Sequence, residues 1–222
     1  MWRDAVVIGG KDLRIEMRSK VTTTQIAPYA LLVLVLFGFA FDQNHSILSQ
    51  AAPGLFWLSV VLCSLLAVQR SFAIESADGA SDGLRMSGVD PAGVFLGKAA
   101  AVAVELLALE VILGFGVVVL FDTRLHDPAL LVLTALAATV GLAAAGTVYG
   151  MVAQGLRARE TLLPLLILPV VAPLLLAATQ AWMSALGLSP NAGWRWLALL
   201  VTFDVLYVAF GVLSFPTLME ET

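Results

Sequence analysis

The sequence has little charge and almost no cysteine. Only 13% of its 222 residues are charged, while 60% are apolar. In a typical soluble domain about a quarter of the residues are charged. This composition excludes an ordinary soluble globular protein and predicts a membrane protein with several spans. The single cysteine, Cys63, excludes an internal disulfide and a cysteine metal cluster.

The usual motifs of catalysis and nucleotide binding are also absent. Segment 93–99 comes nearest to a phosphate-binding loop, but it has one spacer residue too few and no Ser or Thr after Lys98. There is no H-E-x-x-H, no G-x-S-x-G and no Cys/His spacing typical of a metal site. We therefore predict a non-catalytic subunit with no metal site. Energy for any transport work would have to come from another polypeptide.

Six apolar runs make up most of the chain, at residues 25–41, 52–68, 94–121, 128–153, 161–186 and 194–215. A helix needs about 20 residues, and at least about 17, to cross roughly 30 Å of hydrocarbon. The runs therefore predict six transmembrane helices in an all-α membrane protein. Because the composition is uniform, we expect one domain over residues 1–222. The first apolar run, residues 5–8, is too short for a signal peptide.

Residues 2–20 carry a different, amphipathic pattern. On a helix, Trp2, Val6, Leu13 and Met17 fall on one face, and the basic residues fall in a separate arc. This pattern predicts an interfacial helix that lies in the headgroup region of the membrane. The alternative is a basic tail that only sets the topology.

Lys and Arg are distributed unevenly between the two sets of loops. With the N-terminus inside, the outer segments hold only Arg124 and Arg195. The inner segments hold Arg3, Lys11, Arg14, Arg18, Lys20, Arg70, Arg85, Lys98, Arg157 and Arg159. This bias predicts that both termini and the polar segment 69–93 are cytoplasmic.

The two histidines, His45 and His126, fall on the predicted outer loops. Because imidazole is a common axial ligand of haem iron, they are candidates for an outer-face haem contact. An ordinary loop histidine explains each of them equally well.

Three acids fall inside predicted spans: Glu105, Glu110 and Asp204. An acid within a membrane is unfavourable, so it usually faces protein or a wet cavity. The sequence places no basic residue at their depth. We therefore expect them to be protonated or paired with hydroxyl or amide groups such as Thr134, Thr139, Thr202 or Gln180. They are candidates for an intramembrane polar path. The alternative is hydrogen bonding between helices.

Small residues and prolines mark the fourth and fifth spans. Glycines at 141, 146 and 150 favour close helix packing, either within the chain or between two copies. The prolines Pro164, Pro169 and Pro173 each remove a backbone donor and should bend or interrupt the helix. Such a kink is either static or the mark of a moving part.

The polar segment 69–93 mixes acids with a few apolar residues. Glu75 and Asp78 precede Leu84, and glycines break the segment into short pieces. Such a segment suits docking into a groove on a soluble partner. The alternative is a solvated connector.

Three stretches carry a resemblance to a known family. They are residues 52–88 (APGLFWLSVVLCSLLAVQRSFAIESADGASDGLRMSG), 95–99 (FLGKA) and 165–179 (LLILPVVAPLLLAAT). Together they resemble the haem exporter protein B (CcmB) family, permease subunits of an ABC transporter of bacterial cytochrome c maturation. The N-terminal residues 3–20 fit the same pattern.

The resemblance implies a small ABC exporter permease in the bacterial inner membrane, paired as a homodimer with two copies of an ABC ATPase. The family's coupling element lies between the second and third helices, which implicates Glu75, Asp78, Gly79 and Leu84. Other implied partners are a haem-handling membrane protein and a periplasmic haem chaperone; no nucleic acid is expected. We expect no covalently bound cofactor, with haem as possible cargo and ATP on the partner. Whether haem itself crosses, or ATP use only releases the loaded chaperone, stays open.

Three alternatives remain at the level of the sequence. One is an ABC exporter permease for another hydrophobic or lipid-linked substrate. A second is an intramembrane enzyme that uses Glu105 and Asp204 as acid and base, although the chain offers no nucleophile or metal beside them. A third is a passive assembly scaffold.

Overall fold

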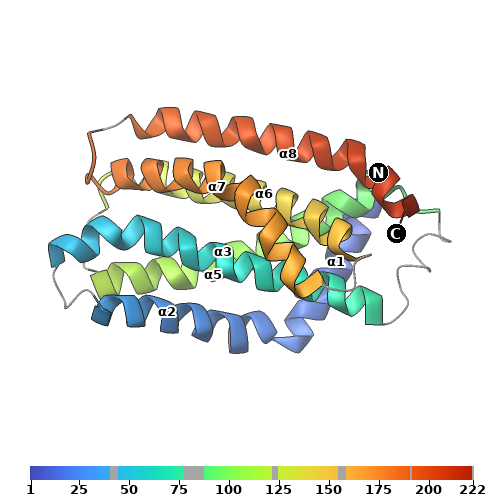
Figure 1. Cartoon of the computed structure of the whole chain (residues 1–222), viewed down its shortest axis with the longest axis horizontal. Helices are drawn as coiled ribbons and strands as arrows, with labels where there is room; N and C mark the ends of the chain where they lie inside the picture. The colour runs from blue at the N-terminus through green and yellow to red at the C-terminus, as the bar shows by residue number, and fades with distance from the viewer. Residues whose placement is uncertain (41–44, 78–87, 122–124, 155–158, 191, 222) are drawn as a thin grey trace.

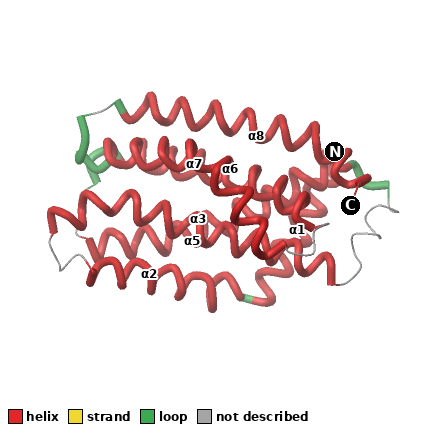
Figure 2. The backbone as a smooth tube through the Cα atoms, in the orientation of Figure 1, coloured by secondary structure: helices red, strands yellow, loops and turns green. Residues whose placement is uncertain are grey.

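A computed structural model of the chain shows a bundle of long helices (Figure 1 and Figure 2). It describes residues 1–40, 45–77, 88–121, 125–154, 159–190 and 192–221, and these ranges contain no strand. The helices are α1 (Trp2–Ser19), the π-helical turn η1 (Thr22–Ile26), α2 (Ala27–Ala40), α3 (His45–Ala77), α5 (Pro91–Phe121), α6 (Pro128–Gln154), α7 (Arg159–Ala185) and α8 (Gly193–Glu221).

Five of these helices are long and apolar enough to cross a membrane. The spans are Ile47–Ile74, Pro91–Phe121, Pro128–Gln154, Leu162–Ala185 and Gly193–Glu220. A sixth span is reached if α1 and the helix that follows it are taken as one bent pair, with 52° between them. The chain is therefore an all-helical, multi-pass membrane protein with five to six candidate spans. The prediction of six separate spans is confirmed for five of them. The first predicted span corresponds to α2, which has 14 residues and is too short to cross a membrane alone.

Both termini lie at the same end of the bundle (Figure 1). The C-terminal end of α3 and the first residues of α5 lie at this end too, and the α7–α8 connection lies at the opposite end. We call the first of these the terminal end. A core of buried apolar side chains draws on every helix, from Ile8 of α1 to Phe215 of α8.

Helix α3 is longer than the apolar run that predicted it. The run 52–68 suggested a short span and assigned residues 69–93 to a connecting loop, but α3 continues from His45 to Ala77 over 33 residues. The reason is tertiary packing. Phe72 is buried, and its ring packs so closely on Gly150 of α6 that a Cβ added to this glycine would lie only 2.4 Å from the ring. After the segment that follows α3, helix α5 begins at Pro91 rather than at residue 94. Asp90 caps this helix, because its carboxylate accepts a hydrogen bond from the Ala92 amide at 3.0 Å.

The glycines of α6 pack within the chain. A Cβ on Gly146 would come within 2.7 Å of Val68, one turn before Phe72 on α3, and one on Gly141 would meet Leu174 of α7 and Asp204 of α8. These close approaches account for the small residues on α6 by intrachain packing, the first of the two alternatives.

Helix α7 contains all three predicted prolines, Pro164, Pro169 and Pro173, and is continuous through them. The expected interruption does not occur, and the ribbon changes direction along its length (Figure 1). The Tyr207 hydroxyl of α8 donates to the Val170 carbonyl at 2.6 Å, next to the carbonyl of residue 169 that Pro173 leaves without its helical donor.

Helix α1 crosses the start of α5 at close range. A Cβ on Gly97 would lie 2.6 Å from the Ala5 carbonyl oxygen, and one on Gly9 would lie 2.9 Å from the Gly97 carbonyl oxygen. Ile8 is buried in this contact, whereas Trp2, Val6 and Met17 remain largely exposed.

Candidate functional site

The terminal end of the bundle holds a group of charged side chains from three helices. Asp12 and Glu16 lie one turn apart on α1 and face basic residues of two other helices. Lys98 of α5 lies 3.4 Å from Asp12, and the Nε of Arg70 on α3 lies 3.3 Å from Glu16. α1 is thus held by ion pairs to both helices that flank residues 78–90.

Lys98 is the most deeply buried charge of this group, with only 2% of its surface exposed. Its ammonium lies 4.8 Å from the centre of the Phe72 ring, within the range of a cation–π contact. Sequence reasoning used Lys98 and Arg70 to orient the chain, considered Lys98 in a rejected phosphate-binding loop, and gave neither residue a partner. The sequence signal that could have predicted these ion pairs is the spacing of Asp12 and Glu16, which places both acids on one face of α1.

Glu16 is the most heavily bonded acid in the group. Besides Arg70, its carboxylate accepts a bond from the Thr22 amide at 2.6 Å and one from the Ser19 hydroxyl at 3.3 Å. These contacts fix the point where α1 ends and η1 begins.

The N-terminal amine adds a second attachment of α1 to α5. The Met1 nitrogen lies 3.2 Å from the Asp90 carboxylate and 3.3 Å from that of Asp4. The hydrogen bond to Asp90, and then the one to Asp4, raise the pKa of the Met1 amine. The same amine lowers the pKa of Asp90.

The three acids of the candidate polar path do not converge. Glu110 of α5 is buried and accepts a hydrogen bond from the Thr139 hydroxyl of α6, a partner that the sequence suggested. Asp204 of α8 lies against Gly141 of α6. Because residues 139 and 141 point about 200° apart on a helix, the two acids lie on opposite sides of α6.

Glu105 is half-buried and lies nearer the terminal end than Glu110. It interacts electrostatically with Glu16, Asp12, Arg70 and Lys98. Arg70 and Lys98 lie toward the terminal end, so the prediction that no basic residue shares the depth of Glu105 stays a prediction. Its position associates it with the charged group rather than with Glu110 and Asp204.

The residues predicted to couple the chain to an ATPase are mostly beyond what the structure describes. Asp78, Gly79 and Leu84 lie outside the described residues. Glu75 lies in the last turn of α3, and its side chain is not described.

The histidine pair receives no geometric test, because the side chain of His45 is not described. His126 is exposed just before α6, and its backbone amide donates to the Ala185 carbonyl at 3.0 Å. Within the described part of the chain, no three His, Cys, Asp or Glu residues gather as metal ligands would.

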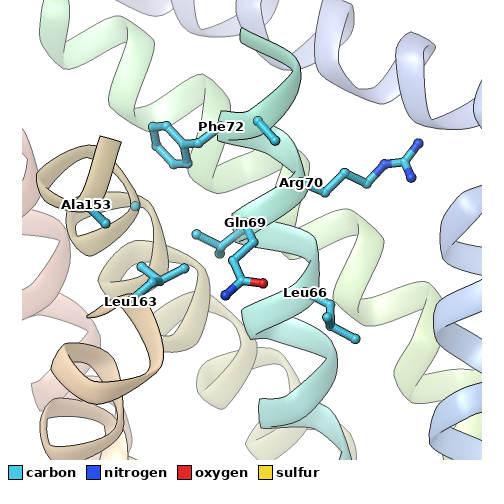
Figure 3. A pocket seen from close by; sticks show the side chains of 9 residues that line it. Leu66, Gln69, Arg70, Phe72, Ala153 and Leu163 are labelled. Atoms are coloured by element: carbon cyan, nitrogen blue, oxygen red, sulfur yellow. The ribbon is translucent and has the colours of Figure 1, made fainter. Parts of the chain in front are cut away.

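Two pockets open beside α3 where its apolar run gives way to Gln69 and Arg70. The first, of about 380 Å³, lies between α3, α6 and α7, next to Phe72 and Leu163. Figure 3 shows Gln69 pointing into it, while Arg70 extends to the other side of α3, toward the N-terminal helices. The second, of about 570 Å³, lies on that other side and also includes Leu66, Gln69 and Arg70.

Comparison with known proteins identifies relatives over most of the chain. The family model described as "CcmB protein" matches residues 4–220. "Heme exporter protein B" of Paracoccus denitrificans is 30% identical over 178 residues, 77% of this chain and 78% of that protein. The protein of that name from Haemophilus influenzae is 30% identical and covers 82% of each chain. The one from Pseudomonas aeruginosa is 27% identical and covers 91% of each.

Proposed function

The chain belongs to the CcmB family, and from this membership we infer that it is the permease subunit of a haem export system in cytochrome c maturation. The observation that carries the inference is the match of the family model to residues 4–220, nearly the whole chain. The helical, multi-pass architecture is the one that a permease requires. The chain is not an enzyme.

The energy for transport would come from an ABC ATPase. The sequence contains no phosphate-binding loop of its own, which is the reason for a partner chain. We propose two copies of the ATPase on a homodimer of this chain. A haem-handling membrane protein and a periplasmic haem chaperone would complete the system, with haem as cargo and ATP on the partner.

We place the ATPase contact on the segment between α3 and α5, with Glu75, Asp78, Gly79 and Leu84 as coupling residues. The segment is bounded by Ala77 and Pro91, both at the terminal end of the bundle. A movement of the ATPase against this segment would be transmitted to α3 and α5, the two helices that Arg70 and Lys98 link to α1 by ion pairs.

The proposed location is the bacterial inner membrane, with both termini in the cytoplasm. The support is the excess of Lys and Arg in the segments that the sequence assigns to the inner side. In this orientation α1 would lie in the cytoplasmic headgroup region. Exposed Trp2, Val6 and Met17 would reach the acyl boundary, and exposed Arg14 and Arg18 would reach anionic headgroups.

Deletion of the gene tests the function directly. We expect c-type cytochromes, measured as covalently bound haem in membranes, to disappear and to return with the wild-type gene. Normal levels after deletion would overturn the proposal and favour export of another hydrophobic or lipid-linked substrate.

Charge reversal tests the coupling segment. Asp78→Lys should lower cytochrome c formation and uncouple ATP hydrolysis while leaving membrane insertion intact. The matched control is Glu220→Lys, which makes the same change at an exposed acid at the terminal end. Equal cytochrome levels in the two variants would rule out Asp78 as a coupling residue.

A further inference from the structure

The larger of the two pockets beside α3 has the layout of a ligand site. We call it the Arg70 pocket. Its lining comes from four elements: Gln25 of η1, Tyr29 of α2, several residues of α3, and Pro164 of α7. Its volume, about 570 Å³, lies within the range typical of sites for small organic ligands.

The walls of the Arg70 pocket are apolar along most of their length and polar at one end. Leu62, Leu65 and Leu66 line it along α3 and are followed by Gln69 and Arg70. The span of α3 ends at Ile74, so Arg70 lies four residues, about 6 Å, inside that end. A ligand that fits must therefore have an apolar body and a polar head near the membrane surface.

The charge of the polar end comes from Arg70. A guanidinium has five N–H donors in a planar fork, and Glu16 engages the Nε side of it at 3.3 Å. This ion pair uses the Nε side alone, so the two terminal nitrogens of the fork remain as donors for a ligand. Within the described part of the chain, Glu16 is the only acid paired with Arg70, and no acid lines the pocket.

We propose that the Arg70 pocket binds an anionic amphiphile. Its apolar body would lie along the leucines of α3, and its carboxylate or phosphate would accept hydrogen bonds from the fork of Arg70. Two molecules supply this chemistry: haem, whose porphyrin carries two carboxylates, and an anionic phospholipid. Haem as the ligand rests on the proposed function.

This assignment differs from the polar path suggested by the sequence. Glu105, Glu110 and Asp204 offer no positive charge to an anionic head, and Glu110 and Asp204 lie apart on two sides of α6. The Arg70 pocket instead joins apolar volume and a positive charge in one place. It therefore places recognition of an anionic cargo on α3 rather than on the acids.

The test uses the full-length chain in nanodiscs with two probes. Haem binding is followed by its absorbance, and retention of phosphatidylglycerol over phosphatidylcholine is followed by native mass spectrometry. Arg70→Gln should weaken binding by roughly tenfold to a hundredfold, the effect of losing a hydrogen bond to a charged group. Arg70→Lys should fall between the wild type and Arg70→Gln, because it keeps the charge and loses the fork.

Two further variants separate binding from folding. Leu66→Trp should block the pocket without disturbing the core, since Leu66 is 39% exposed. Arg195→Gln removes an exposed arginine at the start of α8, outside the pocket, and should bind as the wild type does. Thermal unfolding of each variant verifies that the fold is kept.

The outcomes identify the ligand or overturn the site. Loss of haem binding alone identifies the cargo, and loss of phosphatidylglycerol alone identifies a lipid site. Wild-type binding of both probes by Arg70→Gln and Leu66→Trp would overturn the proposal. The assay needs neither ATPase nor cytochrome, so the site can fail while gene deletion still abolishes c-type cytochromes. If phosphatidylglycerol binding depends on Arg70 but c-type cytochromes are normal after gene deletion, the proposed function is overturned and the site is not.

Discussion

At the terminal end of the bundle, Asp12 and Glu16 of α1 are paired with Lys98 and Arg70. Deeper in the spans, Glu110 accepts a bond from a hydroxyl of α6 and Asp204 lies against a glycine of α6, and neither forms an ion pair within the described part of the chain. The first group balances charge against charge across three helices. The second relies on single polar contacts to α6. The difference indicates that the terminal end is a joint of charged side chains that depend on one another, while each deeper acid can be altered alone.

The largest effect is expected from breaking one pair at the joint. Asp12→Ala leaves Lys98 buried without this carboxylate, and loss of one partner of a buried pair destabilises by about 3–5 kcal/mol. We expect a marked fall in thermal stability in detergent. The double variant Asp12→Ala/Lys98→Met should recover most of it, because the buried charge is removed together with its partner. Lys11, which also lies 3.2 Å from Asp12, is exposed and can be solvated by water.

Arg14→Ala is the control for this change. It removes an exposed charge from the same helix and should leave stability nearly unchanged. If Asp12→Ala and Arg14→Ala unfold at the same temperature, the ion pair does not hold α1 in place.

A smaller loss of stability should follow when a side chain is added to Gly141, next to Asp204. A Cβ on Gly141 would lie 2.2 Å from Leu174 and 2.6 Å from the Asp204 carboxylate. Gly141→Ala should therefore destabilise by about 1–3 kcal/mol through overpacking. Gly10→Ala, where nothing lies within 4 Å, should be neutral or slightly stabilising. Equal unfolding temperatures would contradict the close contact of α8 with α6.

The hydroxyl partner of Glu110 should matter less. Thr139→Val removes the donor and should lower stability by about 1 kcal/mol, as for other hydrogen bonds between membrane helices. Thr202→Val is the matched control, since its hydroxyl donates to the Ala198 carbonyl of its own helix at an exposed position. A larger loss in Thr202→Val than in Thr139→Val would contradict this assignment.

The smallest effect concerns pH and the N-terminal amine. The pKa of Asp90 is lowered in the folded chain, so its contribution is full above the ordinary value of about 4 and is lost as pH falls through the lowered pKa. The pKa of the Met1 amine is raised, so its contribution is full below the ordinary value of about 8 and is lost as pH rises through the raised pKa.

The attachment of α1 to α5 should therefore be tightest between these limits. Hydrogen exchange of the first turn of α1, corrected for the intrinsic pH dependence, should show greatest protection near neutral pH. Protection that stays constant from acid to alkaline pH would show that the amine contributes nothing.

The sequence predicted the helices well and their ends poorly. Hydropathy located the spans because lipid requires long apolar helices with internally bonded backbones. It missed the extension of α3 to Ala77, because that extension is held by Phe72 packing on a glycine of α6. Such a contact joins residues 78 positions apart and leaves no local pattern.

The candidate site was predicted less well. Thr139 was among the suggested partners of an intramembrane acid and is the partner of Glu110. The pairing of Asp12 with Lys98 could not be predicted, because it spans 86 residues and depends on how α1 crosses α5. Asp78, Gly79 and Leu84 lie outside the described residues, so their coupling role stays a prediction.

Affinity purification of the tagged chain from its own membranes in mild detergent tests the central claim most directly. We expect an ABC ATPase to co-purify in equal amount and to hydrolyse ATP in the complex. A chain that purifies intact and without any ATPase would contradict the assignment of this protein as an ATP-driven permease.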